Sequence, residues 1–137
     1  MTWTTDHTLY ISEHGNNAND EINKIEAGQN YGWPIIEGVK KQDGMIAPLF
    51  TSGQNRTWAP SGMAYSEGKL YVATLAGNAV LEFNLETGEQ HEIITGLGRI
   101  RDIFIEDKTI YFISSNTDGR GQPQENDDKL YRLQIVQ

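Results

Sequence analysis

Two adjacent segments decide the fold: Lys69-Leu70-Tyr71-Val72-Ala73-Thr74 and, four residues later, Ala79-Val80-Leu81-Glu82-Phe83-Asn84-Leu85. Both are short and rich in β-branched and aromatic residues, and turn residues bound them, which is typical of β-strands. The Glu86-Thr87-Gly88 turn then leads into a third such segment, residues 90–94. Together the three segments predict a meander of antiparallel hairpins.

The same pattern continues on both sides of this meander, and helical periodicity is missing. Fourteen glycines and four prolines supply the turns that such a chain needs. The sequence therefore predicts an all-β architecture without a crossover helix. The other predicted strands cover residues 8–12, 20–25, 58–65, 100–105, 109–114 and 129–135.

A repeat underlies these strands. Thr8-Leu9-Tyr10-Ile11, Lys69-Leu70-Tyr71-Val72 and Thr109-Ile110-Tyr111-Phe112 share one pattern, and a second strand follows each of them. The repeats are 61 and 40 positions apart, and the longer interval holds a glycine- and proline-containing stretch over residues 30–56. Short strands repeating every ~40–50 residues indicate β-propeller blades. The alternative is a small β-sandwich in which the repetition is accidental.

Three repeats predict about three blades of antiparallel four-stranded sheets, with residues 1–137 forming one partial β-propeller and no second domain. Because propellers close with four to eight blades, three cannot complete a ring. An open ring exposes unpaired strand edges and apolar blade faces. We therefore expect the chain to be a fragment that self-associates, as two copies completing a ring, or that pairs with a missing half.

Composition excludes several classes of function. Eleven Lys and Arg against nineteen Asp and Glu give a formal net charge of −8, which disfavours binding to nucleic acid. No window approaches ~18 consecutive apolar residues, so we expect no membrane segment. The absence of cysteine removes disulfides, thiolate metal sites and cysteine nucleophiles. Redox chemistry on this chain would therefore need a bound cofactor.

Two segments carry candidate binding chemistry. Residues 13–21 place carboxylates, amides and His14 around a glycine, an oxygen-rich pattern that hard cations favour; a plain polar hairpin loop is the alternative. Arg99 and Arg101 begin a strand, and alternation puts them on one face. Two convergent guanidiniums can hold a polyanion, whereas the alternative is solvated arginines paired with nearby acids.

Other polar residues have ordinary interpretations. Ser61 lacks the glycine-flanked elbow of a hydrolase nucleophile. His7 and His91 stand among polar neighbours, as surface histidines do. The loop Asp118-Gly119-Arg120-Gly121-Gln122-Pro123 is either the rim of a site or a connection within a blade.

Six segments, taken in order, form a recognisable set: Ser12-Glu13-His14-Gly15, Asp20-Glu21-Ile22-Asn23, Asn30-Tyr31-Gly32-Trp33-Pro34, Trp58-Ala59-Pro60-Ser61-Gly62-Met63, Leu75-Ala76-Gly77 and Arg99-Ile100-Arg101-Asp102. In this order they resemble the soluble pyrroloquinoline-quinone (PQQ) dependent glucose and aldose-sugar dehydrogenases, and the match covers nearly the whole chain. Members of that family are six-bladed propellers that oxidise the anomeric carbon of aldoses to a lactone, using PQQ held by Ca²⁺. The chain looks like their C-terminal half.

The resemblance implies a role for seven residues. Arg99 and Arg101 match an arginine pair that contacts the quinone and its carboxylates, Thr57 matches a threonine bonded to a PQQ carboxylate, and His14 matches a cofactor-adjacent position. The backbone carbonyls of Gly15 and Asn16 match ligands of the PQQ-linked Ca²⁺, with Asp20 an acidic residue at that metal site.

The chain departs from the family at two positions. Asn16 stands where proline is usual, and Ala76 stands where some glucose dehydrogenases have a cofactor-binding lysine, so the aldose-sugar branch fits better. The family's catalytic histidine comes from the N-terminal half, so we assign no catalytic residue here.

The expected function is therefore that of an enzyme fragment, inactive alone, that contributes part of the PQQ and Ca²⁺ cradle of a dehydrogenase whose partner is an aldose sugar. The full-length protein would be extracytoplasmic. The alternative is a non-catalytic propeller or half-propeller module that binds sugar or a protein partner.

Overall fold

The computed structural model describes residues 1–134, and within that range the chain contains strands and loops but no helix. The strands are β1 (Thr2–Trp3), β2 (Leu9–Glu13), β3 (Glu21–Ile25), β4 (Phe50–Thr51), β5 (Pro60–Ser66), β6 (Lys69–Thr74), β7 (Ala79–Asn84), β8 (Gln90–Thr95), β9 (Ile100–Glu106), β10 (Thr109–Ser114) and β11 (Leu130–Gln134).

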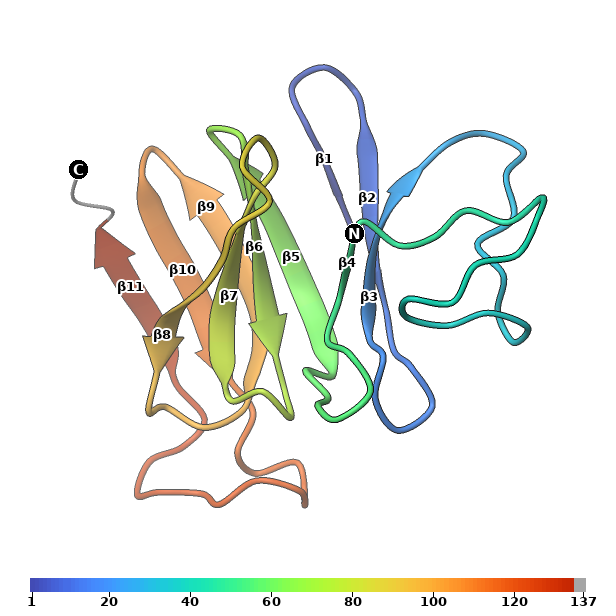
Figure 1. Ribbon diagram of the computed structural model, residues 1–137. Coiled ribbons are helices and arrows are strands. Elements are labelled where there is room, and N and C mark those ends of the chain that lie inside the picture. The colour runs from blue at the N-terminus through green and yellow to red at the C-terminus, as the bar shows by residue number, and fades with distance from the viewer. Residues whose placement is uncertain (135–137) are drawn as a thin grey trace.

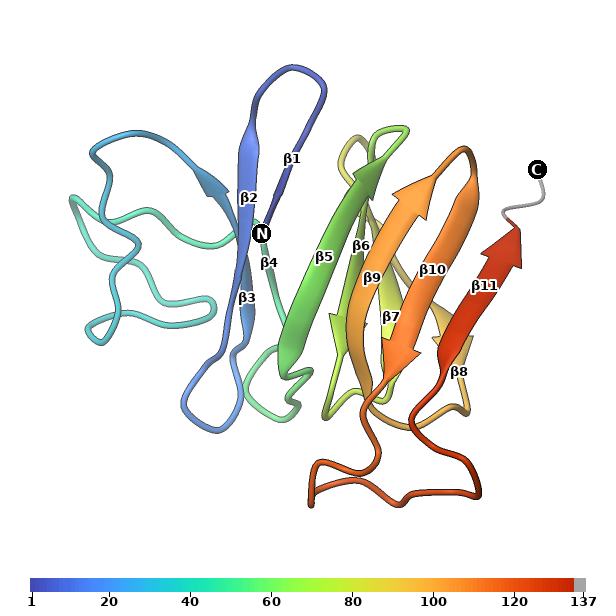
Figure 2. The same ribbon diagram turned by 180° about the vertical axis from the view of Figure 1, so that it is seen from behind.

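The strands form three antiparallel sheets that stand side by side (Figures 1 and 2). The first has the order β1-β2-β3-β4, the second β5-β6-β7-β8 and the third β11-β10-β9. Each sheet is a meander of sequential strands, which confirms the predicted all-β, blade-like architecture. The third sheet has three strands within residues 1–134, one fewer than predicted. Ile135, the predicted end of the last strand, lies outside the described residues.

Neighbouring sheets touch through their first strands, since β5 contacts β9 on one side and β1 on the other. The backbones of β5 and β9 come close at Gly62, where an added Cβ would stand 1.9 Å from Oδ1 of Asp102. The hydroxyl of Ser61 donates to the Ile100 carbonyl (3.1 Å) across the same gap. Ser61 thus links two neighbouring blades through a side-chain hydrogen bond.

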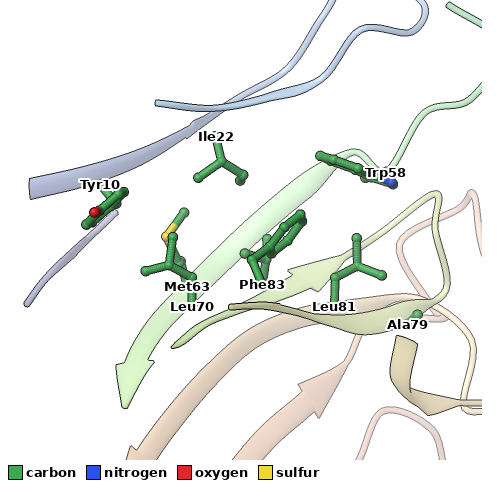
Figure 3. Packing of buried hydrophobic residues seen from close by; sticks show 9 residues of the cluster. Tyr10, Ile22, Trp58, Met63, Leu70, Ala79, Leu81 and Phe83 are labelled. Atoms are coloured by element: carbon green, nitrogen blue, oxygen red, sulfur yellow. The ribbon is translucent and has the colours of Figure 1, made fainter. Parts of the chain in front are cut away.

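The central sheet buries both of its faces, which explains the unbroken apolar run in β6. Side chains alternate across a strand, so Leu70 and Val72 pack toward the first sheet while Tyr71 and Ala73 pack toward the third. On the first-sheet side, Trp58 meets Phe83 edge to face, with ring centroids 5.4 Å apart. Figure 3 shows this cluster: Tyr10, Ile22, Trp58, Met63, Leu70, Val72, Ala79, Leu81 and Phe83.

Most loops lie at two ends of the molecule, whereas the long β3–β4 connection, residues 26–49, projects from the side of the first sheet (Figures 1 and 2). The lower end collects five connections: residues 14–20, 52–59, 75–78, 96–99 and 115–129. The upper end carries the short turns of the hairpins, including residues 67–68 and 107–108. Because successive blades point the same way, residues far apart in sequence meet at the lower end.

Candidate functional site

The lower end of the blades gathers all seven predicted site residues, from three different connections and the first residues of β9. His14, Gly15, Asn16 and Asp20 belong to the β2–β3 loop, and Thr57 belongs to the β4–β5 loop. Arg99 and Arg101 lie at the start of β9. The structure therefore brings together residues that the sequence spreads over 88 positions, from 14 to 101; their roles toward a ligand stay predictions.

Arg99 and Arg101 meet on one carboxylate, that of Asp118 in the β10–β11 loop. Oδ2 of Asp118 accepts hydrogen bonds from Nε of Arg99 (2.9 Å) and Nη2 of Arg101 (3.1 Å). Both arginines thus lie on one face, as strand alternation predicts. The Arg99 side chain is 12% exposed, and that of Arg101 is 44% exposed. Arg99 is built into the protein, whereas Arg101 faces outward.

The Asp118 carboxylate is held in its ionised form. Its other oxygen accepts from the backbone N–H of Arg120 (2.9 Å). That bond, followed by the Arg99 and Arg101 guanidiniums, holds the pKa of Asp118 below the usual range of aspartate, although partial burial opposes the shift. The two arginines and Asp118 together therefore carry two positive charges and one negative charge.

Asn116 holds the backbone of Arg99 in place. This residue was not identified from the sequence. It is 4% exposed, and its side-chain oxygen accepts from the backbone N–H of Arg99 (2.9 Å). Its amide group donates to the Leu97 carbonyl and to Asp127 (3.0 Å each). A Cβ at Gly98 would stand 2.2 Å from the Asn116 side chain, so glycine is needed there, all the more because its φ is +75°.

Asp20 joins the two loops on the other side of the site. It is 2% exposed, and Oδ1 accepts from the backbone N–H of Gly15 (2.9 Å). Oδ2 accepts from the Thr57 hydroxyl (2.8 Å) and from the backbone N–H groups of Trp58 (2.5 Å) and Ala59 (2.9 Å). These four donors occupy the roughly four lone-pair positions of a carboxylate. Asp20 therefore acts as a connector, and its expected role at a metal site stays a prediction.

The same bonds constrain Thr57 and His14. The single hydroxyl proton of Thr57 is committed to Asp20, so a bond from this hydroxyl to a ligand carboxylate requires it to rotate away. Nε2 of His14 lies 2.7 Å from the Pro60 carbonyl, an acceptor, so Nε2 carries a proton and Nδ1 is left as the free ring nitrogen. The His14 ring is thereby fixed against the start of β5.

The turn that begins at Gly15 is very tight, because a Cβ at Gly15 would stand only 1.7 Å from the Ala18 carbonyl oxygen. Asn16 follows on the exposed side of the loop. Within residues 1–134, no group of three His, Asp or Glu side chains is placed to bind a metal ion. A cation at this end would therefore depend on carbonyl oxygens such as those of Gly15 and Asn16.

Two acids of the same segment point elsewhere. Glu13 and Glu21 face each other across β2 and β3, and the amide nitrogen of Asn23 lies 3.4 Å and 3.3 Å from their carboxylates. Burial, together with the charge of Glu21, raises the pKa of Glu13. The acids of residues 13–21 thus have different roles. Asp20 joins loops at the lower end, whereas Glu13 and Glu21 bond within the first sheet.

A hollow of about 480 Å³ adjoins Arg99 between the β6–β7 turn and the β10–β11 loop. Its lining is mainly polar and includes Arg99, Arg120, Asn78 and Gln122. Two guanidiniums and several amides suit a polar, anionic molecule. His7 in the β1–β2 turn and His91 on the outer strand β8 are exposed and lie apart from this hollow.

A sequence model of the glucose/sorbosone dehydrogenases matches residues 1–132. The chain belongs to the glucose/sorbosone dehydrogenase family. This confirms the family resemblance drawn from the six segments.

Solved structures of relatives show the same fold. The PQQ-bound form of aldose sugar dehydrogenase from Streptomyces coelicolor superposes with a TM-score of 0.90 at 32% identity, covering 97% of this chain and 41% of the relative. An oxidoreductase (glucose dehydrogenase) from Thermus thermophilus gives 0.86 at 32% identity, covering 96% and 43%. This glucose/sorbosone dehydrogenase family chain thus spans about two fifths of those proteins.

The aldose sugar dehydrogenase YliI of Escherichia coli is 28% identical in an alignment 137 positions long that covers 82% of this chain and 37% of that protein. Quinoprotein glucose dehydrogenase B of Acinetobacter calcoaceticus is 37% identical over a shorter stretch of 57 residues. Among residues 1–134, no helix has the length and apolarity needed to cross a bilayer.

Proposed function

We propose that this chain supplies part of the PQQ- and calcium-binding cradle of a sugar dehydrogenase that oxidises the anomeric carbon of an aldose to a lactone. The observation that carries the proposal is the convergence of Arg99 and Arg101 on one face at the loop end, beside a polar hollow. PQQ is a planar quinone with three carboxylates, so a donor set of this kind fits it.

Arg101 is the residue best placed to bind a cofactor carboxylate. It uses Nε and Nη2 for Ser115 and Asp118, and no hydrogen bond within residues 1–134 uses its Nη1 group. Nη1 therefore retains two donors that an anion could use. Arg99 spends Nη1 on the Leu75 carbonyl and contributes chiefly its charge.

Calcium would be held by the carbonyls of Gly15 and Asn16, since oxygen ligands suit this hard cation. When bound, PQQ supplies the electron-accepting quinone and Ca²⁺ supplies Lewis-acid polarisation. His14 would line the cofactor with Nδ1 as an acceptor. Asp20 would keep the Gly15 and Thr57 loops at a fixed separation.

The rest of the activity would come from outside this chain. None of its three histidines is assigned as the base that takes the sugar proton, and the chain spans about two fifths of its solved relatives. We propose that it is inactive alone and that the enzyme to which it belongs works outside the cytoplasm, on an aldose.

The experiment is a titration of the chain with PQQ in the presence and absence of Ca²⁺, followed by absorbance and by thermal melting. We expect a spectral change and a higher melting temperature only when both are present. Arg101→Ala should weaken PQQ binding about 10- to 100-fold, because a hydrogen bond to a charged group is worth ~1.5–3 kcal/mol.

Arg132→Ala, an exposed arginine on β11 of the same sheet, serves as the control and should bind as the wild type does. No response of the wild type to PQQ and Ca²⁺ together would exclude the cradle. A response that Arg101→Ala retains in full would exclude the assigned role of Arg101.

A further inference from the structure

The β10–β11 loop, residues 115–129, does more than connect two strands. It leaves β10 at Ser114, which pairs with Ile100 at the start of β9, so its first residues lie beside the arginines. Ser115 donates its backbone N–H to the Arg99 carbonyl (2.8 Å) and accepts two bonds from Arg101 through its hydroxyl (3.2 and 3.0 Å). The loop thus contacts both arginines before it reaches Asp118.

We infer that Asp118 is the positioning residue of the arginine pair, and that it fixes both guanidiniums in the orientation in which they receive an anionic cofactor. This inference rests on the proposed function for the identity of the anion. Its structural part, that one carboxylate oxygen holds two arginine side chains, is independent of PQQ.

Hydrogen bonds within the β10–β11 loop fix the position of Asp118. Asp118 is tied to its own loop by the Arg120 N–H, and its side chain is 18% exposed. Asn116 is fixed through Asp127 and Asp128, the latter accepting its backbone N–H. An aspartate that merely paired with arginines in solvent would not need these supports.

A negative charge beside a site for an anion has two opposing effects. Removing it would favour anion binding, by less than about threefold for a unit charge roughly 7 Å away in water and by more where the groups are partly buried. Immobilising a flexible side chain in advance is worth roughly two- to tenfold for each of the two arginines. Because the two guanidiniums already compensate the charge of Asp118, we expect positioning to outweigh repulsion, so that loss of Asp118 weakens anion binding.

The first test is independent of PQQ. In ¹⁵N-arginine-labelled protein, the Nε–H groups of Arg99 and Arg101 should exchange slowly with water, and Asp118→Ala should accelerate the exchange of Arg99 about tenfold or more. Asp118→Asn, which keeps an acceptor oxygen, should restore part of the protection. Asp43→Ala removes the same charge from an exposed loop and should change neither signal. Unchanged Arg99 exchange in Asp118→Ala would overturn the inference.

The second test measures PQQ affinity with Ca²⁺ present, by absorbance. Asp118→Ala should bind PQQ about fivefold more weakly or worse, with Asp118→Asn intermediate and Asp43→Ala at the wild-type value. Tighter binding by Asp118→Ala would show that Asp118 competes with the ligand and would overturn the inference. If the wild type does not bind PQQ, only the proposed function is refuted, because the exchange measurement still decides the role of Asp118.

Discussion

Individual residues hold the loop end of this molecule together, and Asp20 is the most heavily used of them. Its carboxylate accepts four hydrogen bonds. One comes from Gly15, five positions away in the same loop, and three come from residues 57–59 of the β4–β5 loop, which are 37 to 39 positions away. Three of the donors are backbone N–H groups, which carry a large free-energy cost when buried without a partner. The geometry of the site therefore depends on a carboxylate that is itself buried.

Asp20→Asn should lower the free energy of unfolding by about 2–4 kcal/mol. The variant replaces one acceptor oxygen by an NH₂ group that opposes the surrounding donors, and it removes the charge that strengthens the remaining bonds. Urea unfolding followed by tryptophan fluorescence measures this, with Asp43→Asn, an exposed aspartate, as control. A loss no larger than that of the control would contradict the connector role.

Asp118 gives the loop end a defined acid sensitivity. Its pKa is lowered by the Arg120 N–H and the two guanidiniums, so its contribution to stability is complete above the unfolded-state value of about 3.9. That contribution is lost as pH falls through the lower folded-state value. The melting temperatures of wild type and Asp118→Asn should differ by a constant amount from pH 7 to 5 and converge below pH ~4. A difference that disappears already near pH 6 would contradict this account.

At the scale of strands and turns, the sequence was sufficient for the blades but not for the loops between them. Turn residues marked the ends of the long strands. β6 and β7 are buried on both faces, so they appear in the sequence as apolar runs. The two-residue strands β1 and β4 carry too few side chains to show a period. Pairing between Ser114 and Ile100 could have placed residues 115–118 beside Arg99, but the choice of Asp118 depends on the path of a 15-residue loop.

One hairpin turn is open to improvement. The β9–β10 turn has positive φ at both Asp107 (46°) and Lys108 (61°), as a type I′ turn requires, whereas the matching β5–β6 turn uses Glu67 and Gly68. A non-glycine residue in this region costs ~1–2 kcal/mol, and glycine costs ~0.5–1 kcal/mol in chain entropy. Lys108→Gly should therefore raise the free energy of unfolding by about 0.5–1 kcal/mol.

Urea titration measures that gain, and the exposed Lys108–Glu67 pair at 3.9 Å that the change removes contributes little. Gly68→Lys in the equivalent turn should act in the opposite direction. Destabilisation by Lys108→Gly would show that the left-handed turn is not strained.

Within residues 1–134, the third sheet presents an unpartnered apolar face on the side away from the second sheet. Phe104 is 59% exposed, Leu130 72% and Ile113 38%, and the strand register puts all three on this face, whereas the equivalent face of the second sheet is buried by the third. Because relatives are more than twice as long, we propose that a further blade of the family's propeller covers this face in the complete protein. The chain alone should instead associate with itself through it.

Light scattering at micromolar concentration should therefore give a mass above 15.4 kDa for the chain alone. Phe104→Lys combined with Leu130→Lys should reduce that mass, since charged side chains oppose burial of the face. A strictly monomeric wild type would contradict the proposed association, without bearing on the cradle.

The central claim is that the loop end of this partial propeller receives PQQ. An amide ¹H–¹⁵N spectrum recorded during titration with PQQ and Ca²⁺ tests it most directly, because it locates the ligand on the chain. We predict that shifts concentrate in residues 14–20, 57–59, 75–78, 96–101 and 115–122, and that the turns at residues 67–68 and 107–108 stay unchanged. Shifts confined to the opposite end, or none at all, would contradict the account.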